Sequence, residues 1–258
     1  MRLDIRMTEL GLAGSRNKAK AMIEEGFVSV NGAVVTKPSM EIADTVNIEV
    51  ADGTLAYVGR GGLKLEAALD AFSIDVSGVR AVDVGSSTGG FTDCMLKRGA
   101  SCVYAIDSGR GQLHPSLASD TRVHVHEGFN ARNMTTELTD GTVDLAVCDV
   151  SFISQTLLHK AIADVLKDEG IFVSLIKPQF EAGRAHLNKN GIVRDKKVML
   201  HTIESVVDSA KNAGMQLRGV IPSPIKGGDG NTEFLAFFIK SAVVSAPDID
   251  LNKAIATL

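Results

Sequence analysis

The feature that most constrains the fold of this chain is the alternation of strand-like and helix-like segments from residue 63 onward. The runs expected as strands are Ala81–Val84, Val103–Ile106, Val123–His126, Leu145–Cys148, Ile171–Ile176, Leu217–Ile221 and Phe234–Ile239. The segments expected as helices are Leu63–Phe72, Thr92–Arg98, Gln155–Val165 and Lys196–Ala213. Such alternation is typical of a doubly wound α/β fold, so we expect a mostly parallel, seven-stranded sheet with helices on its faces.

A smaller segment with a different pattern precedes this alternation. Ser15 is placed to cap a helix that runs to Glu25. The sequence FVSVNGAVV then alternates apolar residues around Asn31-Gly32, the pair most typical of a two-residue hairpin turn, and VNIEV predicts a further strand. The turn-rich stretch Val50–Gly62 indicates a linker. We therefore expect a small α+β domain with its linker over residues 1–58 and a larger domain over residues 59–258.

Composition narrows the class of protein. Hydrophobic residues make up 45% and charged residues 22% of 258 residues, as in ordinary soluble proteins. Cys94, Cys102 and Cys148 are an odd number and lack metal-ligand spacing, which favours reduced thiols in the cytoplasm over disulfides or a metal site. The apolar run Gly170–Ile176 is far shorter than the roughly 18 residues of a membrane helix, and no signal peptide is recognisable. We expect a cytoplasmic protein without membrane spans.

A glycine-rich turn, DVGSSTGGFT at Asp83–Thr92, follows the first strand of the larger domain. In open parallel sheets, ligands bind beyond the carboxyl ends of the strands, and glycines there allow close approach of a ligand. Position 87 is serine, so the dinucleotide fingerprint G-x-G-x-x-G is not matched. The spacing of Asp83, Gly85, Ser87 and Gly89 instead resembles the first motif of S-adenosylmethionine (SAM) methyltransferases. The alternative is a strand-to-helix turn without a ligand.

An acidic residue at the end of the next expected strand supports the ligand hypothesis. Asp107 lies 22 residues after Gly85, where a carboxylate can accept hydrogen bonds from both hydroxyls of a ribose. Asp107 can also be a solvated residue at a strand end. The combination favours a nucleoside ligand, and the residues by themselves do not distinguish NAD from SAM.

Four further charged residues, Lys64, Asp149, Lys177 and Glu233, are expected near the same edge of the sheet. Taken singly, each is most often a solvated charge. Together, two lysines and two carboxylates can compensate one another's burial. Methylation of a ribose hydroxyl, which is a very weak acid, needs a group that directs or removes its proton. The spacing leaves open which lysine is the base, and whether a lysine only stabilises the developing alkoxide.

The sequence that begins at Asp149 allows another comparison. Asp149-Val-Ser-Phe152 is similar in outline to the Asp/Asn-Pro-Pro-aromatic signature of enzymes that methylate exocyclic base nitrogens. Both prolines are missing, and those enzymes do not need the two lysines. Base methylation is therefore the weaker interpretation.

The order Lys64, Asp149, Lys177, Glu233, with DVSFIS at Asp149–Ser154 and KPQFE at Lys177–Glu181, resembles the TlyA family of haemolysin-named ribosomal RNA 2'-O-methyltransferases, whose catalytic domain is FtsJ-like. The N-terminal sequence RLDIRMTELGLAGSRNKAKAMIEEGFVSVNG, with KPS at Lys37–Ser39, is similar to the small RNA-binding domain first seen in ribosomal protein S-four. The resemblance covers nearly the whole chain. It implies a Rossmann-like SAM methyltransferase domain behind an RNA-binding domain.

The resemblance also implies roles for particular residues. The catalytic tetrad would be Lys64, Asp149, Lys177 and Glu233, with Lys177 as the base. SAM would be bound by Gly85, Ser86, Gly89, Gly90, Phe91 and Asp107. The chain departs from the general methyltransferase pattern at Ser87, which replaces the middle glycine and leaves less room for the cofactor.

The first twenty residues are net basic, although the formal charge of the whole chain is −4. The basic residues are Arg2, Arg6, Arg16, Lys18 and Lys20, against Asp4 and Glu9. A solvated helix face is one explanation. Contact with RNA phosphates is the other, and the resemblance favours it. Because methyl transfer needs an exposed nucleotide, looped or single-stranded RNA is the expected substrate form.

The leading hypothesis is SAM-dependent 2'-O-methylation of ribosomal RNA, with cytidine as the nucleoside that the resemblance implies. Two alternatives come from other classes of protein. The haemolysin name suggests a membrane-lytic protein, which the missing spans disfavour. A ribosome-binding or assembly module without catalysis is the other, and the intact set of four charged residues disfavours it weakly.

Overall fold

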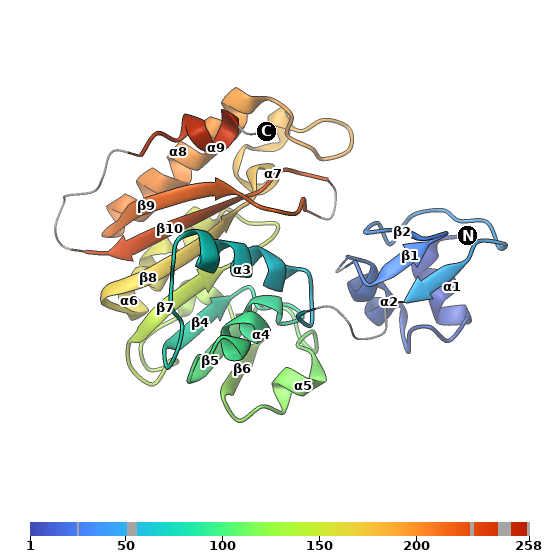
Figure 1. The fold of residues 1–258 in the computed structure, drawn as a ribbon, viewed down its shortest axis with the longest axis horizontal. Coiled ribbons are helices and arrows are strands. Elements are labelled where there is room, and N and C mark those ends of the chain that lie inside the picture. Colours follow the sequence, from blue (N-terminus) through green and yellow to red (C-terminus); the bar gives the residue numbers. More distant parts are fainter. Residues whose placement is uncertain (25, 51–55, 228–229, 242–248, 257–258) are drawn as a thin grey trace.

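The computed structural model of the protein describes residues 1–24, 26–50, 56–227, 230–241 and 249–256. At the N-terminus, helices α1 (Leu3–Glu9) and α2 (Arg16–Glu24) pack on an antiparallel sheet of β1 (Val28–Val30), β2 (Ala33–Val34) and β3 (Ile48–Val50), in the order β2-β1-β3 (Figure 1). This part of the chain has a hydrophobic core of its own. Its fully buried members include Leu3, Met7, Ala19, Ile23 and Val28. The expected small α+β domain is confirmed.

The helix cap and the hairpin turn predicted for this domain are both present in the structure. Ser15 Oγ accepts a hydrogen bond from the Lys18 amide at 3.2 Å, so it caps α2. The expected helix end at Glu25 lies outside the described residues, as does the middle of the expected linker, residues 51–55. Asn31 and Gly32 have φ values of 52° and 79°. Both values suit a two-residue hairpin turn between β1 and β2.

The larger domain is built on a mostly parallel, seven-stranded sheet, as predicted. Its strands are β4 (Arg80–Val84), β5 (Cys102–Asp107), β6 (Val123–Glu127), β7 (Val143–Cys148), β8 (Leu166–Ile176), β9 (Met215–Pro222) and β10 (Phe234–Lys240). They lie in the order β6-β5-β4-β7-β8-β10-β9, and β10 is antiparallel to both of its neighbours. The strand order reverses beside β4, and this reversal is where open α/β sheets bind ligands.

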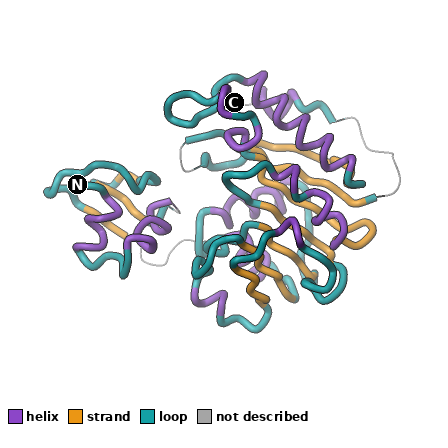
Figure 2. Tube along the Cα trace, turned by 180° about the vertical axis from the view of Figure 1, so that it is seen from behind, coloured by secondary structure: helices purple, strands orange, loops and turns teal. Residues whose placement is uncertain are grey.

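Helices cover both faces of this sheet (Figure 2). Alternate residues of each strand point to opposite faces, so Ala81 packs with α3 (Gly61–Ala71), α4 (Gly90–Lys97) and α5 (Pro115–Ala118), whereas Val82 packs on the other face. That other face is covered by α6 (His159–Val165), α8 (Lys196–Asn212) and α9 (Asn252–Ala256). The resulting two cores hold the strand ends in fixed positions.

The structure differs from the sequence expectation between residues 155 and 181. The predicted helix Gln155–Val165 is divided into a 3₁₀ turn, η2 (Gln155–Leu157), and α6, and the Gln155 side chain is buried. A short helix, α7 (Pro178–Glu181), was not predicted. Pro178 presets the first turn of α7 and Gly183, with a φ of 78°, follows it, so the helix is too short for hydrophobic periodicity to detect.

Two further expectations concern the whole chain. Cys94, Cys102 and Cys148 are free thiols, the first and last of them buried. Over the residues described, no helix combines the length and the apolar character that crossing a membrane requires.

Candidate active site

The sheet topology brings the four predicted charged residues to one place. Asp149 directly follows β7 and Lys177 directly follows β8, two neighbouring parallel strands. Glu233 immediately precedes β10, whose first residue pairs with the last residue of β8 because the two strands are antiparallel. Lys64 is presented by the first turns of α3. Side chains that are 169 residues apart in the sequence, Lys64 and Glu233, thereby come into direct contact.

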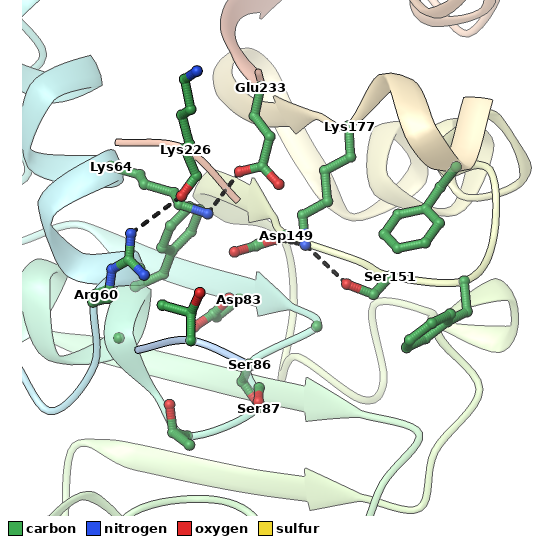
Figure 3. Close-up of a pocket in the computed structure, with 18 of the residues that line it drawn as sticks. Arg60, Lys64, Asp83, Ser86, Ser87, Asp149, Ser151, Lys177, Lys226 and Glu233 are labelled. Atoms are coloured by element: carbon green, nitrogen blue, oxygen red, sulfur yellow. Dashed lines mark hydrogen bonds and ion pairs between the residues drawn. The ribbon is translucent and has the colours of Figure 1, made fainter. Parts of the chain in front are cut away.

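The four residues form two ion pairs beside each other (Figure 3). Lys64 Nζ lies 2.7 Å from Glu233 Oε2, and Lys177 Nζ lies 2.5 Å from Asp149 Oδ1. Lys177 Nζ also donates a hydrogen bond of 2.9 Å to Ser151 Oγ. The side chains of Lys64 and Glu233 are almost completely buried. The expected convergence of two lysines and two carboxylates is therefore present, in a definite pairing.

The two ion pairs also act on each other. Burial opposes the charged form of Lys177, but Asp149 and Glu233 outweigh burial and raise the pKa of its amine. Burial likewise works against the charged form of Asp149, yet Lys177 and Lys64 prevail and lower its pKa. Lys177 and Asp149 therefore each interact with the oppositely charged residue of their own pair and with that of the neighbouring pair. The arrangement keeps Asp149 ionised and favours the protonated form of Lys177.

A cavity of about 320 Å³ lies between the tetrad and the glycine turn. Residues of the larger domain form most of its wall, and Lys20, Thr36 and Pro38 of the N-terminal domain contribute to it. The predicted site residues that line it are Lys64, Gly85, Ser86, Gly90, Phe91, Asp149, Lys177 and Glu233. Gly89 and Asp107 are not among the lining residues.

Asp83 is a buried carboxylate in the wall of this cavity. Its Oδ2 accepts a hydrogen bond of 2.7 Å from Thr92 Oγ1, whereas its Oδ1 is buried without a hydrogen-bond partner among the residues described. Burial raises the pKa of Asp83 to about 7. A buried acceptor without a donor fits a cationic ligand group, such as the ammonium of SAM. Asp83 was part of the recognised motif, but its spacing alone did not indicate a binding role.

The glycines of the turn have neighbours within the protein. A Cβ at Gly85 would lie 2.5 Å from the Asp149 carbonyl oxygen, so glycine allows the turn to approach the segment that carries Asp149. Gly89 caps α4 with a φ of 97°, and a Cβ there would meet Leu117. Ser87 adopts a φ of 46°, which supplies the left-handed turn that a glycine usually supplies. Packing within the protein therefore already requires glycine at positions 85 and 89.

Asp107 ends β5 beside this turn. Its Oδ2 accepts a hydrogen bond from the Ser87 amide at 2.8 Å, and its Oδ1 accepts one from the Gly109 amide at 2.7 Å. Each carboxylate oxygen has a second lone-pair site. Asp107 thus has an organising role in the protein, and its contact with a ribose stays a prediction.

Two aromatic rings stand next to Lys177. Phe152 is 88% exposed, and its ring centroid lies 5.1 Å from that of Phe180. Both residues line the cavity, and Lys177 Nζ lies 5.9 Å from the Phe180 centroid. An exposed aromatic side chain at a cavity offers a stacking surface for a base. In the sequence, Phe152 drew attention only through the comparison with base methylation, because exposure cannot be read from a sequence.

The basic residues of the N-terminal domain have different surroundings. Arg2 and Arg16 both form ion pairs of 2.9 Å with the buried Asp4, and Arg2 together with Arg16 lowers the pKa of Asp4 to about 2. Arg6 pairs with Glu9 at 3.4 Å. Arg16, Lys18 and Lys20 are exposed. Part of the predicted basic face is therefore engaged with carboxylates, and Asp4 holds Arg2 and Arg16 side by side.

Comparisons with known proteins agree with this geometry. The FtsJ-like methyltransferase family matches residues 57–240, and the S4 domain family matches residues 1–45. The 16S/23S rRNA (cytidine-2'-O)-methyltransferase TlyA of Mycobacterium tuberculosis is 41% identical, covering 90% of this chain and 87% of that protein. Hemolysin A of Brachyspira hyodysenteriae is 44% identical, covering 93% of this chain and 100% of that protein.

A solved structure gives the same result. A protein of Streptococcus thermophilus described as a candidate hemolysin superimposes with a TM-score of 0.79 at 40% identity, covering 100% of this chain and 94% of that one. Sequence families, curated relatives and this structure agree over nearly the full length of the chain. The protein belongs to the FtsJ-like methyltransferase family and has an S4 domain at its N-terminus.

Proposed function

We propose that the protein methylates the 2'-hydroxyl of a cytidine in ribosomal RNA, with SAM as methyl donor, in the cytoplasm. The observation that supports this most is the double ion pair of Lys64, Glu233, Lys177 and Asp149 in one wall of a cavity whose other wall is the glycine turn. A ribose hydroxyl needs a proton acceptor beside it, and the tetrad supplies an amine held by carboxylates. The relatives named for rRNA cytidine-2'-O-methylation support the substrate.

In this reaction, some residues would bind the cofactor and others would act on the ribose hydroxyl. Asp83 would hold the cofactor ammonium, Asp107 its ribose, and Gly85, Ser86, Gly89, Gly90 and Phe91 would shape the site around it. SAM, when bound, supplies an electrophilic methyl group. Lys177, in its neutral form, would accept the 2'-hydroxyl proton as the oxygen bonds to the methyl carbon and the carbon–sulfur bond breaks. Asp149 would hold Lys177 in place, while Lys64 and Glu233 would complete the charge balance.

Recognition of RNA would involve both domains. The exposed Arg16, Lys18 and Lys20, with Arg2 and Arg6, suit contact with phosphates. Lys20 also lines the cavity, so the N-terminal domain has a basic side chain at the place where the nucleotide would enter. Phe152 would stack on the exposed base of the target nucleotide.

Transfer of labelled methyl from SAM tests this function, with rRNA or ribosomal subunits from cells that lack the protein as substrate. We expect label in the RNA, mapped by mass spectrometry to the ribose of one cytidine. Replacing Lys177 by Ala should abolish transfer while SAM binding stays within a few-fold, because proton-transfer groups contribute about 10²–10⁴ in rate. Label on a base, or full activity of Lys177→Ala, would contradict the proposal.

The two alternatives predict other outcomes. A membrane-lytic protein would release dye from lipid vesicles, and the Lys177→Ala variant would release as much dye as the wild-type protein at the same concentration. An assembly module would bind ribosomal subunits without transferring methyl groups. The tetrad favours the enzyme over both, because neither alternative requires two adjacent lysine–carboxylate pairs, one of them buried and the other partly buried.

A further inference from the structure

The segment that supplies Ser151 to Lys177 is held in an uncommon conformation. It connects β7 to η2 and carries Ser151, whose Oγ accepts the hydrogen bond from Lys177, and Phe152, whose φ is 67°. A positive φ in a bulky residue costs energy and persists only where the surroundings enforce it. Since Phe152 itself is 88% exposed, burial of its own side chain does not enforce it.

The end of this segment that follows Phe152 is held by Glu181, at the end of α7. Glu181 Oε2 accepts a hydrogen bond of 2.6 Å from Ser154 Oγ, and its Oε1 accepts one of 2.9 Å from the Gln155 amide. Gln155 is buried, and its side chain also bonds to Ser174 and to the Leu175 carbonyl in β8. The far end of the segment is thereby fastened to the two elements that flank Lys177.

The direction of the Lys177 amine depends on the oxygens that surround it, Asp149 Oδ1 and Ser151 Oγ. A neutral lysine amine has two N–H groups and one lone pair. When Asp149 and Ser151 accept the two N–H groups, the lone pair is left for a third direction, as proton acceptance requires. With Asp149 as sole acceptor, the amine is free to rotate about its Cε–Nζ bond.

We propose that Glu181 is a positioning residue, which acts through Ser154 and Gln155 to hold Ser151 against Lys177 and thus orients the amine for methyl transfer. The proposal rests on the function proposed above. Glu181 does not line the cavity, so its effect on the reaction is indirect. The alternative is a carboxylate that stabilises the fold and has no specific effect on Lys177.

A double-mutant cycle distinguishes the two. We expect Glu181→Gln and Ser151→Ala each to lower the single-turnover rate by about tenfold to a hundredfold, as small misplacements of a catalytic group do. The double variant should be no slower than the slower single variant, because both substitutions remove the same support. The dissociation constant for SAM should stay within about twofold of the wild-type value, since the glycine turn and Asp83 are unchanged.

A control and a second variant exclude a general loss of stability. Asp144, at the opposite end of β7, accepts a backbone hydrogen bond from Arg80 and pairs with Lys167, so Asp144→Asn removes a comparable carboxylate far from the site. It should leave the rate unchanged. If Glu181→Gln fails to fold, Ser154→Ala, which removes one of the two bonds, takes its place in the cycle.

A readout independent of methyl transfer separates this inference from the proposed function. Acetylation of Lys177 by acetic anhydride, measured against pH by mass spectrometry, reports the state of its amine. We expect the pH profile to change alike in Glu181→Gln and Ser151→Ala and to stay unchanged in Asp144→Asn. A wild-type rate in Glu181→Gln, multiplicative rate losses in the double variant, or an unchanged acetylation profile would each overturn the proposal. Absence of 2'-O-methylation by the wild-type protein would instead refute the proposed function, and the acetylation profile would still decide on Glu181.

Discussion

Lys177 and Asp149 pose a chemical problem, because the ion pair that holds the amine also keeps it protonated. Asp149 and Glu233 raise the Lys177 pKa above its ordinary value, despite burial, so little neutral amine is present near pH 7. If Lys177 is the base, the single-turnover rate should rise about tenfold per pH unit between roughly pH 7 and 9, since the neutral fraction rises in that proportion.

The Asp149→Asn variant provides the companion experiment to this pH profile. Removing the carboxylate removes one of the charges that raise the Lys177 pKa, so the rising limb of the profile should move to lower pH. A rate independent of pH over the same interval would mean that Lys177 acts as a fixed positive charge beside the developing alkoxide.

Asp83 gives a second prediction, on cofactor binding. Burial raises its pKa to about 7, so the carboxyl is neutral below that pH and charged above it. A charged carboxylate binds an ammonium more strongly, so the affinity for SAM should increase as the pH rises from 6 to 8. Calorimetric titration of SAM at several pH values measures this. The Asp83→Asn variant should bind weakly with no such trend, and an equal trend in the variant would assign the titration to another group.

Among the elements, the loop after β5 depends on one carboxylate of β6. Glu127 accepts hydrogen bonds from the amides of Gly111, Gln112 and Leu113, at 2.5, 2.8 and 3.0 Å. This loop also supplies the Gly109 amide to Asp107. Glu127→Gln should therefore loosen the loop and weaken SAM binding about tenfold, with methyl transfer at saturating SAM nearly unchanged.

A carboxylate in a neighbouring turn provides the control for Glu127. Asp120 accepts hydrogen bonds from the Arg122 amide and side chain, outside the cavity wall. Asp120→Asn should leave the dissociation constant for SAM as it is. Equal losses in both variants would show a general effect on the edge of the sheet.

The helix α2 gives a prediction on RNA binding. Arg16→Ala combined with Lys18→Ala should reduce the slope of log affinity against log salt by roughly 0.7–0.9 for each phosphate that the variant no longer neutralises. Both side chains are exposed, and neither lines the cavity, so SAM binding should not change. Lys253→Ala, an exposed lysine of α9, is the matched control. An unchanged slope would show that Arg16 and Lys18 do not contact RNA phosphates.

At the same scale, the sequence predicts long elements better than short ones. All seven expected strands are present, because apolar runs bounded by turn residues produce a clear signal over four or more residues. The helix α7 has four residues and the turn η2 has three, so each spans about one helical turn or less and contains no repeat of the helical period. Their side-chain contacts, such as those of Glu181 with Ser154 and Gln155, join segments that no local pattern connects.

For the molecule as a whole, the convergence of Asp149 and Lys177 was predictable from parallel strands, whereas the pairing within the tetrad was not. Parallel strands end at the same edge of a sheet, so Asp149 and Lys177 had to lie near each other. The proximity of Glu233 depends on the antiparallel insertion of β10 beside β8, which the sequence did not indicate. The pairing of Lys64 with Glu233, and the position of Asp107 outside the cavity wall, follow from side-chain packing in three dimensions.

The central claim is that the tetrad acts on a 2'-hydroxyl, and one substitution in the RNA tests it most directly. Once the modified nucleotide has been mapped, labelled methyl transfer is measured on two matched RNAs that differ only in a 2'-deoxy sugar at that nucleotide. We predict no label in the deoxy RNA and only a modest loss of binding, because phosphate contacts supply most of the affinity and the missing oxygen is the nucleophile. Persistent labelling of the base at that nucleotide would contradict the account and assign the Asp149–Phe152 segment to base methylation.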